Sequence, residues 1–318
     1  MALQDIIDTA PNIEVNRSKL VAQTVSRSGR ISTASRNWAN PFRFTVTPKP
    51  VWSYTEYQSI FEPIFNNDRY LPSRINLTNY DATTGALIAT GMTWLTEYQG
   101  DLDTNDNGTL DNTTASSAQG TRIIITLGGT PTANDYIFKQ GDYVRLAQNI
   151  YPYIVTDDII VPTVATGITG TITAAGVVTV SNGITNTTTA TITTITSVSS
   201  TTGLSVGQTI TESGVNVGSF GGITYIKSID SATQITIIST TDCTSGAITF
   251  AGSATSVAIP IHRGYLDYSG YTVAGQTVRC GRLAASFTVM VTKLPQFRFL
   301  PGKLVEFTSD FELVEEIL

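Results

Sequence analysis

The sequence predicts a mainly β protein, and three observations support this fold class. Hydrophobic residues make up 41% of the 318-residue chain and charged residues only 14%, against a usual charged fraction of about 25%. Short runs of alternating apolar and polar residues recur along the chain, and Thr, Ser, Gly and Asn fill the intervening segments. This composition excludes simple disorder and long solvated helices, which are rich in Glu, Lys and Arg.

Charge and composition also exclude several classes of function. A net charge of -6 and a pI near 4.8 disfavour a general nucleic-acid-binding protein. No apolar run approaches the roughly 18 residues of a membrane helix, and the first residues lack the pattern of a secretory signal. The single histidine, His262, removes the material for most zinc sites and Ser-His-Asp triads. We expect Cys243 and Cys280 to be free, buried thiols.

Composition divides the chain into three parts. We expect an N-terminal arm at residues 1–16, one β domain built from residues 17–162 and 253–318, and an inserted domain at residues 163–252. The insert has no charged residue before Glu212 and few after it. Such an insertion is tolerated at an exposed loop tip, because a longer loop adds little to the entropic cost of closure.

The first elements follow from local patterns. Ile6, Ile7 and Ile13 suggest a short helix or an extended arm, and residues 19–25 and 30–35 flank a Ser-Arg-Ser-Gly turn that is typical of a β-hairpin. A strand follows, in which Phe42, Phe44 and Val46 share one buried face.

One short helix interrupts the strands. Ser53 and Glu56 form a capping box at its start, and Tyr57, Ile60, Phe61 and Ile64 follow at helical spacing. Pro63 should end or kink this helix.

The remaining elements are strands. Residues 121–127 and 142–155 continue the first domain, and Thr/Ile/Val runs in the insert predict a small β-sandwich. A low-complexity linker is the alternative, which the Ile and Val periodicity disfavours. Residues 287–313 read as closing strands that rejoin the first domain, with a turn at residues 300–303. We expect a β-sandwich or barrel-like domain with an aromatic core of Trp38, Phe42, Phe44, Trp52, Tyr57 and Phe61.

One segment has the spacing of a calcium-binding loop. Residues 103–111 resemble an EF-hand loop in which Asp103, Asn105, Asn107 and Asp111 would supply oxygen ligands. Thr114 stands where a bidentate Glu is expected. The alternative is a hairpin turn at Asn107-Gly108 within a polar loop. No other cofactor is expected.

Two further motifs have simple structural interpretations. Gly203-Leu204-Ser205-Val206-Gly207 matches the nucleophile elbow of hydrolases, but no helical pattern follows it, and we interpret it as a β-turn. His262 is expected to be a structural side chain at a strand end rather than a general base. We expect no enzymatic activity.

Opposite charges gather at the two ends of the chain. Seven basic residues and no acidic one occur between residues 15 and 50, while Asp310, Glu312, Glu315 and Glu316 make the C-terminus acidic. The basic residues could contact phosphate groups, face outward from strands, or contact the acidic tail. A contact between subunits is a further option, because complementary patches set the register of an interface. The basic N-terminal hairpin and the acidic C-terminus are therefore candidate contacts of a ring.

The order of several motifs resembles tail-tip proteins of tailed bacteriophages, of the distal-tail and minor-tail kind. The motifs are Ser26-Arg27-Ser28-Gly29-Arg30, Arg36-Asn37-Trp38, Phe42-Arg43-Phe44, the Glu56/Tyr57 helix, residues 140–146 and 151–155, and the closing residues 300–307 and 310–315. Residues 202–210 resemble the Thr/Gly-rich β modules of phage tail and fibre proteins.

This resemblance implies a non-enzymatic virion protein, made in the host cytoplasm, that forms a ring at the distal tail tube or in the baseplate. A hexamer is usual for such rings, and the implied partners are further copies and other tube, baseplate or fibre proteins. The alternative is a receptor- or carbohydrate-binding tail fibre protein in which the insert is the active part.

Overall fold

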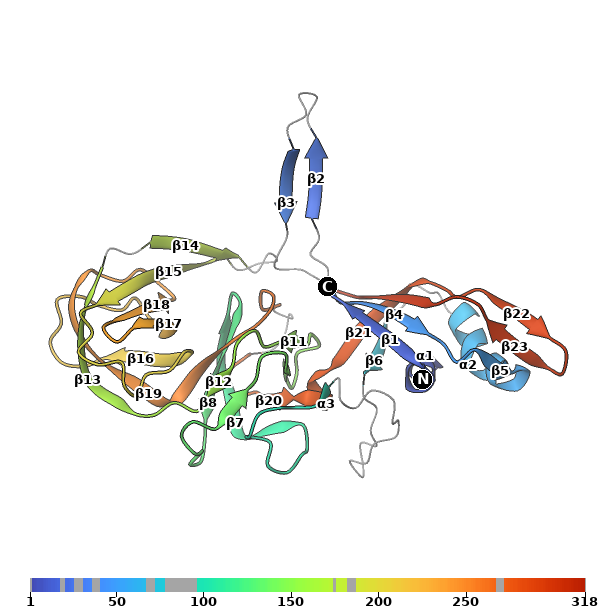
Figure 1. Cartoon of the computed structure of the whole chain (residues 1–318), viewed down its shortest axis with the longest axis horizontal. Coiled ribbons are helices and arrows are strands. Elements are labelled where there is room, and N and C mark those ends of the chain that lie inside the picture. Colours follow the sequence, from blue (N-terminus) through green and yellow to red (C-terminus); the bar gives the residue numbers. More distant parts are fainter. Residues whose placement is uncertain are drawn as a thin grey trace. The chain divides into compact units, whose positions relative to one another are not determined.

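The structure is a computed structural model that describes residues 2–17, 21–25, 31–35, 41–66, 72–77, 96–173, 176–181, 187–266 and 272–317. Half of the chain lies in strands and about a tenth in helices, which confirms the mainly β class (Figure 1). The chain forms two compact units. Unit 1 comprises residues 1–97, 150–152 and 281–318, and unit 2 comprises residues 98–149 and 153–280.

A five-stranded antiparallel sheet forms the centre of unit 1. Its order is β1-β4-β24-β21-β6, with β1 at Asn12–Asn16, β4 at Arg43–Thr47, β24 at Phe311–Glu315, β21 at Ser286–Lys293 and β6 at Ser73–Asn76. Phe42, Phe44 and Val46 are buried, as their alternation predicted. The rings of Phe42 and Phe44 each meet that of Phe287 edge-on at 4.9 Å. The short helix α3 (Gly281–Ala284) precedes β21.

A smaller sheet and one helix complete the aromatic core of unit 1. The sheet has the order β22-β23-β5, with β22 at Phe297–Leu300, β23 at Leu304–Phe307 and β5 at Val51–Ser53. Helix α2 (Tyr54–Asn66) places Phe61 against Trp52 and Phe307, with ring centroids 5.2 and 4.4 Å away. Every described residue of the predicted core is buried; Trp38 lies outside the described residues. The helix does not end at Pro63.

The first sixteen residues belong to unit 1 and not to a separate arm. Helix α1 (Ala2–Thr9) buries Ile6 and Ile7, and Gln4 exchanges two hydrogen bonds with the backbone of Asn76, at 2.8 and 2.9 Å. Strand β1 then pairs with β4 along its whole length.

The predicted hairpin is present. Strand β2 (Val21–Val25) pairs antiparallel with β3 (Ile31–Ser35), and Gln23 lies opposite Thr33. Within the described part of the chain these two strands form a sheet of their own, drawn as a separate ribbon in Figure 1.

Unit 2 is built on one continuous antiparallel sheet. One part has the order β11-β10-β20-β7-β8-β19, with β11 at Tyr153–Ile154, β10 at Tyr143–Leu146, β20 at Thr277–Cys280, β7 at Thr109–Gln119, β8 at Arg122–Leu127 and β19 at Gly246–Pro260. The short strands β9 (Tyr136–Phe138) and β12 (Ile159–Ile160) form a separate pair.

The Thr-rich segment forms a closed six-stranded barrel, and the predicted sandwich is wrong in this respect. The barrel strands follow the order β19-β13-β15-β18-β17-β16 and return to β19. They are β13 (Ala165–Ile172), β15 (Thr187–Thr196), β16 (Gln208–Glu212), β17 (Thr224–Ser231) and β18 (Gln234–Ser239), with β14 (Gly176–Ser181) paired to β15 outside the ring. The core contains Ile195, Ile226, Ile235, Ile237 and Phe250, all fully buried.

The compact units differ from the predicted domain boundaries of 163 and 252. Strand β19 pairs with β13 through residues 246–252 and with β8 through residues 256–260. Because one strand serves both the barrel and the adjoining sheet, residues 98–149 group with the barrel in unit 2 and not with unit 1.

Candidate functional site

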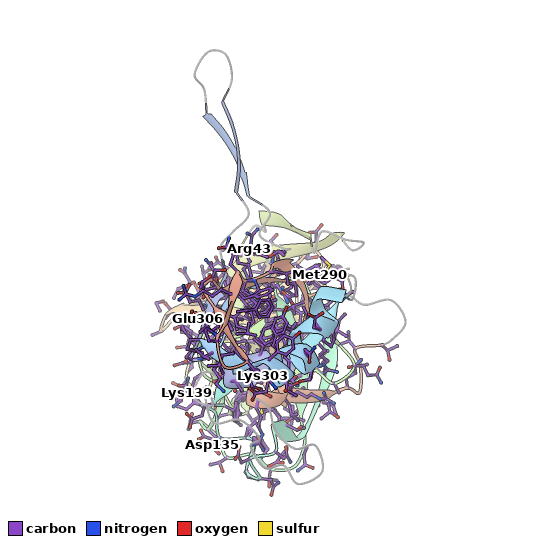
Figure 2. All side chains as sticks on the ribbon, turned by 90° about the vertical axis from the view of Figure 1, so that its right-hand side faces the viewer. Arg43, Asp135, Lys139, Met290, Lys303 and Glu306 are labelled. Atoms are coloured by element: carbon purple, nitrogen blue, oxygen red, sulfur yellow. The ribbon has the colours of Figure 1, made fainter. Side chains whose placement is uncertain are left out.

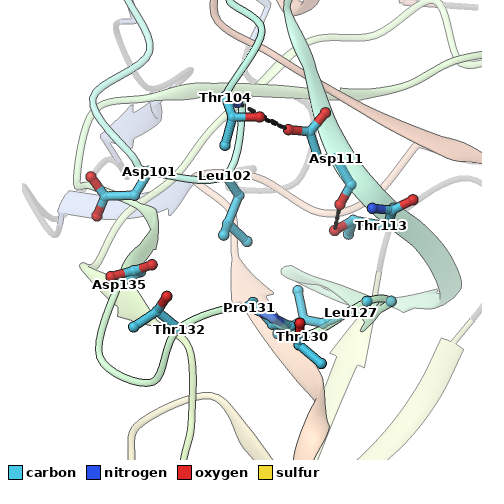
Figure 3. Close-up of a pocket in the computed structure, with 13 residues that line it drawn as sticks. Asp101, Leu102, Thr104, Asp111, Thr113, Leu127, Thr130, Pro131, Thr132 and Asp135 are labelled. Atoms are coloured by element: carbon cyan, nitrogen blue, oxygen red, sulfur yellow. Dashed lines mark hydrogen bonds between the residues drawn. The ribbon is translucent and has the colours of Figure 1, made fainter.

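A pocket of about 410 Å³ opens in unit 2 beside the predicted calcium loop. Three carboxylates line it, from Asp101, Asp111 and Asp135, together with threonines and the apolar side chains of Leu102, Leu127 and Pro131, and no basic residue is in its lining (Figure 3). Such a lining favours positively charged groups and hydrogen-bond donors. The sequence patterns did not single out this pocket, because its walls come from separate loops.

Hydrogen bonds within residues 103–111 hold the two outer carboxylates of the predicted calcium loop. Asp103 accepts the backbone N–H groups of Asn107 and Gly108, at 2.9 and 2.7 Å. Asp111 accepts the N–H of Thr104 at 3.0 Å, the Thr104 hydroxyl, and the side-chain amide of Asn105 at 3.3 Å. These bonds lower the pKa of Asp111, with the bonds from Thr104 as the main cause.

This arrangement fits a calcium ion poorly. Asn105 directs its amide nitrogen, a donor, toward Asp111, whereas a calcium ligand must direct an oxygen toward the ion. Among the described residues no group of three His, Cys, Asp or Glu side chains is placed to hold a metal. Calcium binding by Asp103, Asn105, Asn107 and Asp111 stays a prediction that would require these contacts to change.

Two buried ionisable groups lie close to this loop. The thiol of Cys280 lies 3.7 Å from Asp103 Oδ2, and burial raises its pKa. Asp142 accepts the N–H groups of Gln99 and Lys139, at 3.1 and 2.9 Å, and burial raises the pKa of its carboxyl. Both side chains are buried within unit 2. Of the two thiols predicted to be buried, Cys280 is buried and Cys243 is partly exposed.

The G-x-S-x-G segment is a turn, as the sequence suggested. Gly203 and Gly207 have φ angles of 83° and 84°, in the left-handed region, and strand β16 follows directly without a helix. The Ser205 N–H donates to the side chain of Gln208 at 3.1 Å. The segment therefore lacks the strand–turn–helix geometry of a nucleophile elbow.

His262 has a structural place. Its ring Nδ1 accepts the backbone N–H of Ile154 at 3.0 Å, and the backbone N–H of His262 donates to the Ile154 carbonyl at 2.9 Å. The neighbouring Arg263 is fully buried, with its guanidinium 5.3 Å from the centre of the Tyr153 ring. These residues fasten β11 to the chain that follows β19.

The acidic C-terminus is only partly available for contacts with other subunits. Glu315 is buried and accepts the N–H of Phe42 at 3.0 Å, while Glu312 pairs with Lys293 at 2.9 Å. On the basic side, Arg17, Arg43 and Lys49 are exposed; Lys19, Arg27, Arg30 and Arg36 lie outside the described residues. Glu315 is therefore not a surface charge, which the sequence alone did not reveal.

One surface feature escaped the sequence analysis. The exposed large apolar side chains of unit 1 within the described residues are Val51, Tyr54, Phe299 and Leu304, and all four lie on or beside the small sheet β22-β23-β5. Phe299 shares a face of this sheet with the buried side chains of Val305 and Trp52. Val51 and Leu304 lie on the opposite face. The alternation of β22 placed Phe297 and Phe299 on one face, but no local signal distinguishes a face covered by protein from one left open.

Comparison of the chain with models of protein families gives no match, and a search of curated proteins gives none either. No helix within the described ranges combines the length and apolar character needed to cross a membrane. The resemblance to tail-tip proteins thus stays a prediction.

Proposed function

We propose that this chain is a structural virion protein of a tailed phage, which forms a ring at the distal tail tube or in the baseplate. The observation that carries the proposal is the β2–β3 hairpin, whose strands pair only with each other among the described strands. An isolated two-stranded hairpin is marginally stable in water and needs a third strand or an apolar surface. A neighbouring subunit supplies both.

Donation of the hairpin from each subunit to the next would also allow the subunits to close into a ring. An element donated by one copy to a different surface of the next makes a heterologous contact, and repeated contacts of this kind close into a ring when the rotation permits. Six copies would agree with the family that the motifs resemble. In the virion the ring would contact tube, baseplate or fibre proteins, and its role would be mechanical and not catalytic.

The barrel supports a peripheral docking or spacer role better than carbohydrate binding. Of its three aromatic residues, Phe250 and Tyr225 are buried, and Phe220 is partly buried with its ring 6.1 Å from that of Phe250. Sugar-binding surfaces commonly present exposed aromatic rings, and none of these three side chains is exposed.

Negative-stain electron microscopy and mass photometry of the full-length protein test the proposal. We expect a ring with a central channel and a mass close to six times 34.1 kDa. A slender trimer would support the fibre protein instead, above all if the protein also binds a glycan array. A monomer at concentrations of about 10 μM would contradict both, since stable assemblies of this kind have micromolar or tighter contacts.

A further inference from the structure

The pocket beside residues 103–111 has walls that the fold of unit 2 holds in place. Its volume of about 410 Å³ lies within the range of about 300–1,000 Å³ that is typical of small-molecule sites. The Asp101 N–H donates to the Tyr136 carbonyl, and the Tyr136 N–H donates to the Asp101 carboxylate, both at 2.7 Å. The Asp111 N–H donates to the Leu102 carbonyl at 2.8 Å. These bonds tie the loop before β7 to β7 itself and to β9, so the pocket is present before any ligand binds.

The three carboxylates of the pocket stand on two sides of it. Figure 3 shows Asp101 and Asp135 on one side and Asp111 on the other. The Leu102 side chain projects between them in the same view. Among the residues that the structure describes, no three acidic, His or Cys side chains are grouped to hold a metal. The separation suits a ligand that is longer than a single ion and carries a positive charge at each end.

The pocket also has an apolar surface. Leu102, Leu127 and Pro131 supply it. Aliphatic chains lie along apolar surface while their charged ends stay beside polar groups, as the methylene stem of a lysine side chain does. A hydrated inorganic cation gains nothing from such contacts. The lining therefore favours ammonium groups carried on an aliphatic chain.

The charge of this region favours a cation. Asp101 uses one carboxylate oxygen for the Tyr136 N–H, and within the described residues the Asp135 carboxylate accepts no hydrogen bond. Residues 98–149 contain six aspartates and three basic residues. Of these three, Arg145 is buried, and Lys139 places its Nζ 4.7 Å from the centre of the Tyr136 ring, outside the lining (Lys139 and Asp135 are labelled in Figure 2). A cleft lined by one sign of charge concentrates ions of the opposite sign.

We propose that this pocket binds a linear aliphatic diamine or polyamine. One ammonium group would lie beside Asp101 and Asp135, and the methylene chain would cross Leu102. A second ammonium group would reach Asp111, which accepts three hydrogen bonds within its loop. A carboxylate offers about four acceptor sites, so one remains for the ligand. The inference is separate from the proposed ring and assigns a ligand to unit 2 alone.

The first test is isothermal titration calorimetry of the full-length protein with putrescine and spermidine. Butylamine is the matched control ligand, because it has the chain length of putrescine and a single ammonium group. At about 150 mM salt, charges more than about 8 Å apart are largely screened. Putrescine should bind about tenfold tighter than butylamine or more, since its second ammonium group adds a charge-assisted hydrogen bond. Equal affinities, or no binding of putrescine and spermidine at millimolar concentration, overturn the inference.

The second test is Asp135→Asn, with Asp106→Asn as the matched control. Asp135→Asn removes a charge from the pocket without breaking a hydrogen bond to a described residue, and it should weaken putrescine binding about tenfold or more. Asp106 has φ 48°, which asparagine also adopts, and it lies outside the lining. Asp106→Asn should change the affinity by about twofold or less. Circular dichroism melting checks that both variants are folded, and equal losses in the two overturn the inference.

Calcium chloride and the ring assay give two further comparisons. Calcium that binds wild type, is displaced by putrescine and is lost in Asp135→Asn would identify the pocket as a metal site and overturn the inference. A protein that forms rings and binds no amine overturns this inference alone. A protein that binds putrescine and forms no ring overturns only the proposed function.

Discussion

At the scale of single residues, the most consequential side chain of unit 1 is a buried glutamate. Glu315 is 3% exposed, and its carboxylate accepts the N–H of Phe42, while its own N–H donates to the Phe42 carbonyl at 2.8 Å. It thereby fastens the last strand, β24, to the chain that enters β4. A charge that looks like part of an acidic tail in the sequence is a structural group in the fold.

Glu315→Ala should lower the free energy of unfolding by about 1–3 kcal/mol, because it leaves the buried N–H of Phe42 without this acceptor. Urea denaturation of unit 1, followed by tryptophan fluorescence, measures the change. The neighbouring Glu316→Ala is the control and should stay within about 0.5 kcal/mol of wild type. Equal effects of the two substitutions would show that the carboxylate of Glu315 is dispensable.

At the scale of elements, helix α2 begins as its sequence indicates. Glu56 accepts the N–H of Ser53 at 2.9 Å and its hydroxyl at 2.8 Å, and the Ser53 hydroxyl accepts the N–H of Glu56 at 3.2 Å. This is a complete capping box. The bond from the Ser53 N–H is the main cause that lowers the pKa of Glu56 below its ordinary value of 4.5.

The capping box should make part of the stability of unit 1 depend on pH. Because the folded-state pKa is lowered, the contribution of the carboxylate is present above pH 4.5 and is lost as the pH falls through the folded value. Wild type should melt at a higher temperature than Glu56→Gln at pH 7, and the difference should shrink at pH 3. A difference of the same size at both pH values would contradict this assignment.

The barrel illustrates how neighbouring elements decide a fold that local patterns leave open. Gln208 lies opposite Val257, Thr209 donates its hydroxyl to the Ser256 carbonyl at 3.0 Å, and the Ala258 N–H donates to the Gly207 carbonyl at 2.7 Å. Gly207, at φ 84°, permits this approach, since a Cβ there would lie 2.7 Å from the Ala258 carbonyl oxygen. These contacts close the barrel.

At the scale of the whole molecule, the barrel is not an independent insert that ends at residue 252. Its closing contacts with β16 come from residues 250–252 and continue through Val257, in the half of β19 that also pairs with β8. The charge distribution follows the same division. Unit 1 has equal numbers of acidic and basic residues, so the net charge of -6 belongs to unit 2.

Two fragments test where the barrel ends. Residues 163–260 retain all of the contacts between β16 and β19 and should melt cooperatively, whereas residues 163–252 lose those made by residues 256–258. We expect the shorter fragment to be less stable by about 2 kcal/mol or more, because it loses several hydrogen bonds and the burial of Val257. Thermal melting followed by circular dichroism makes the comparison, and equal melting temperatures would argue against the shared strand.

The sequence by itself determined the mainly β class, the hairpin, the start of α2 and most of the buried aromatic face, because each depends on residues a few positions apart. It could not determine that Glu315 is buried, that the contacts closing the barrel continue past residue 252 to Val257, or that Phe299 is exposed beside an open edge. Those facts depend on which strands pair across long separations in the chain. Alternation says that a strand has two faces, and only the tertiary structure decides what covers each of them.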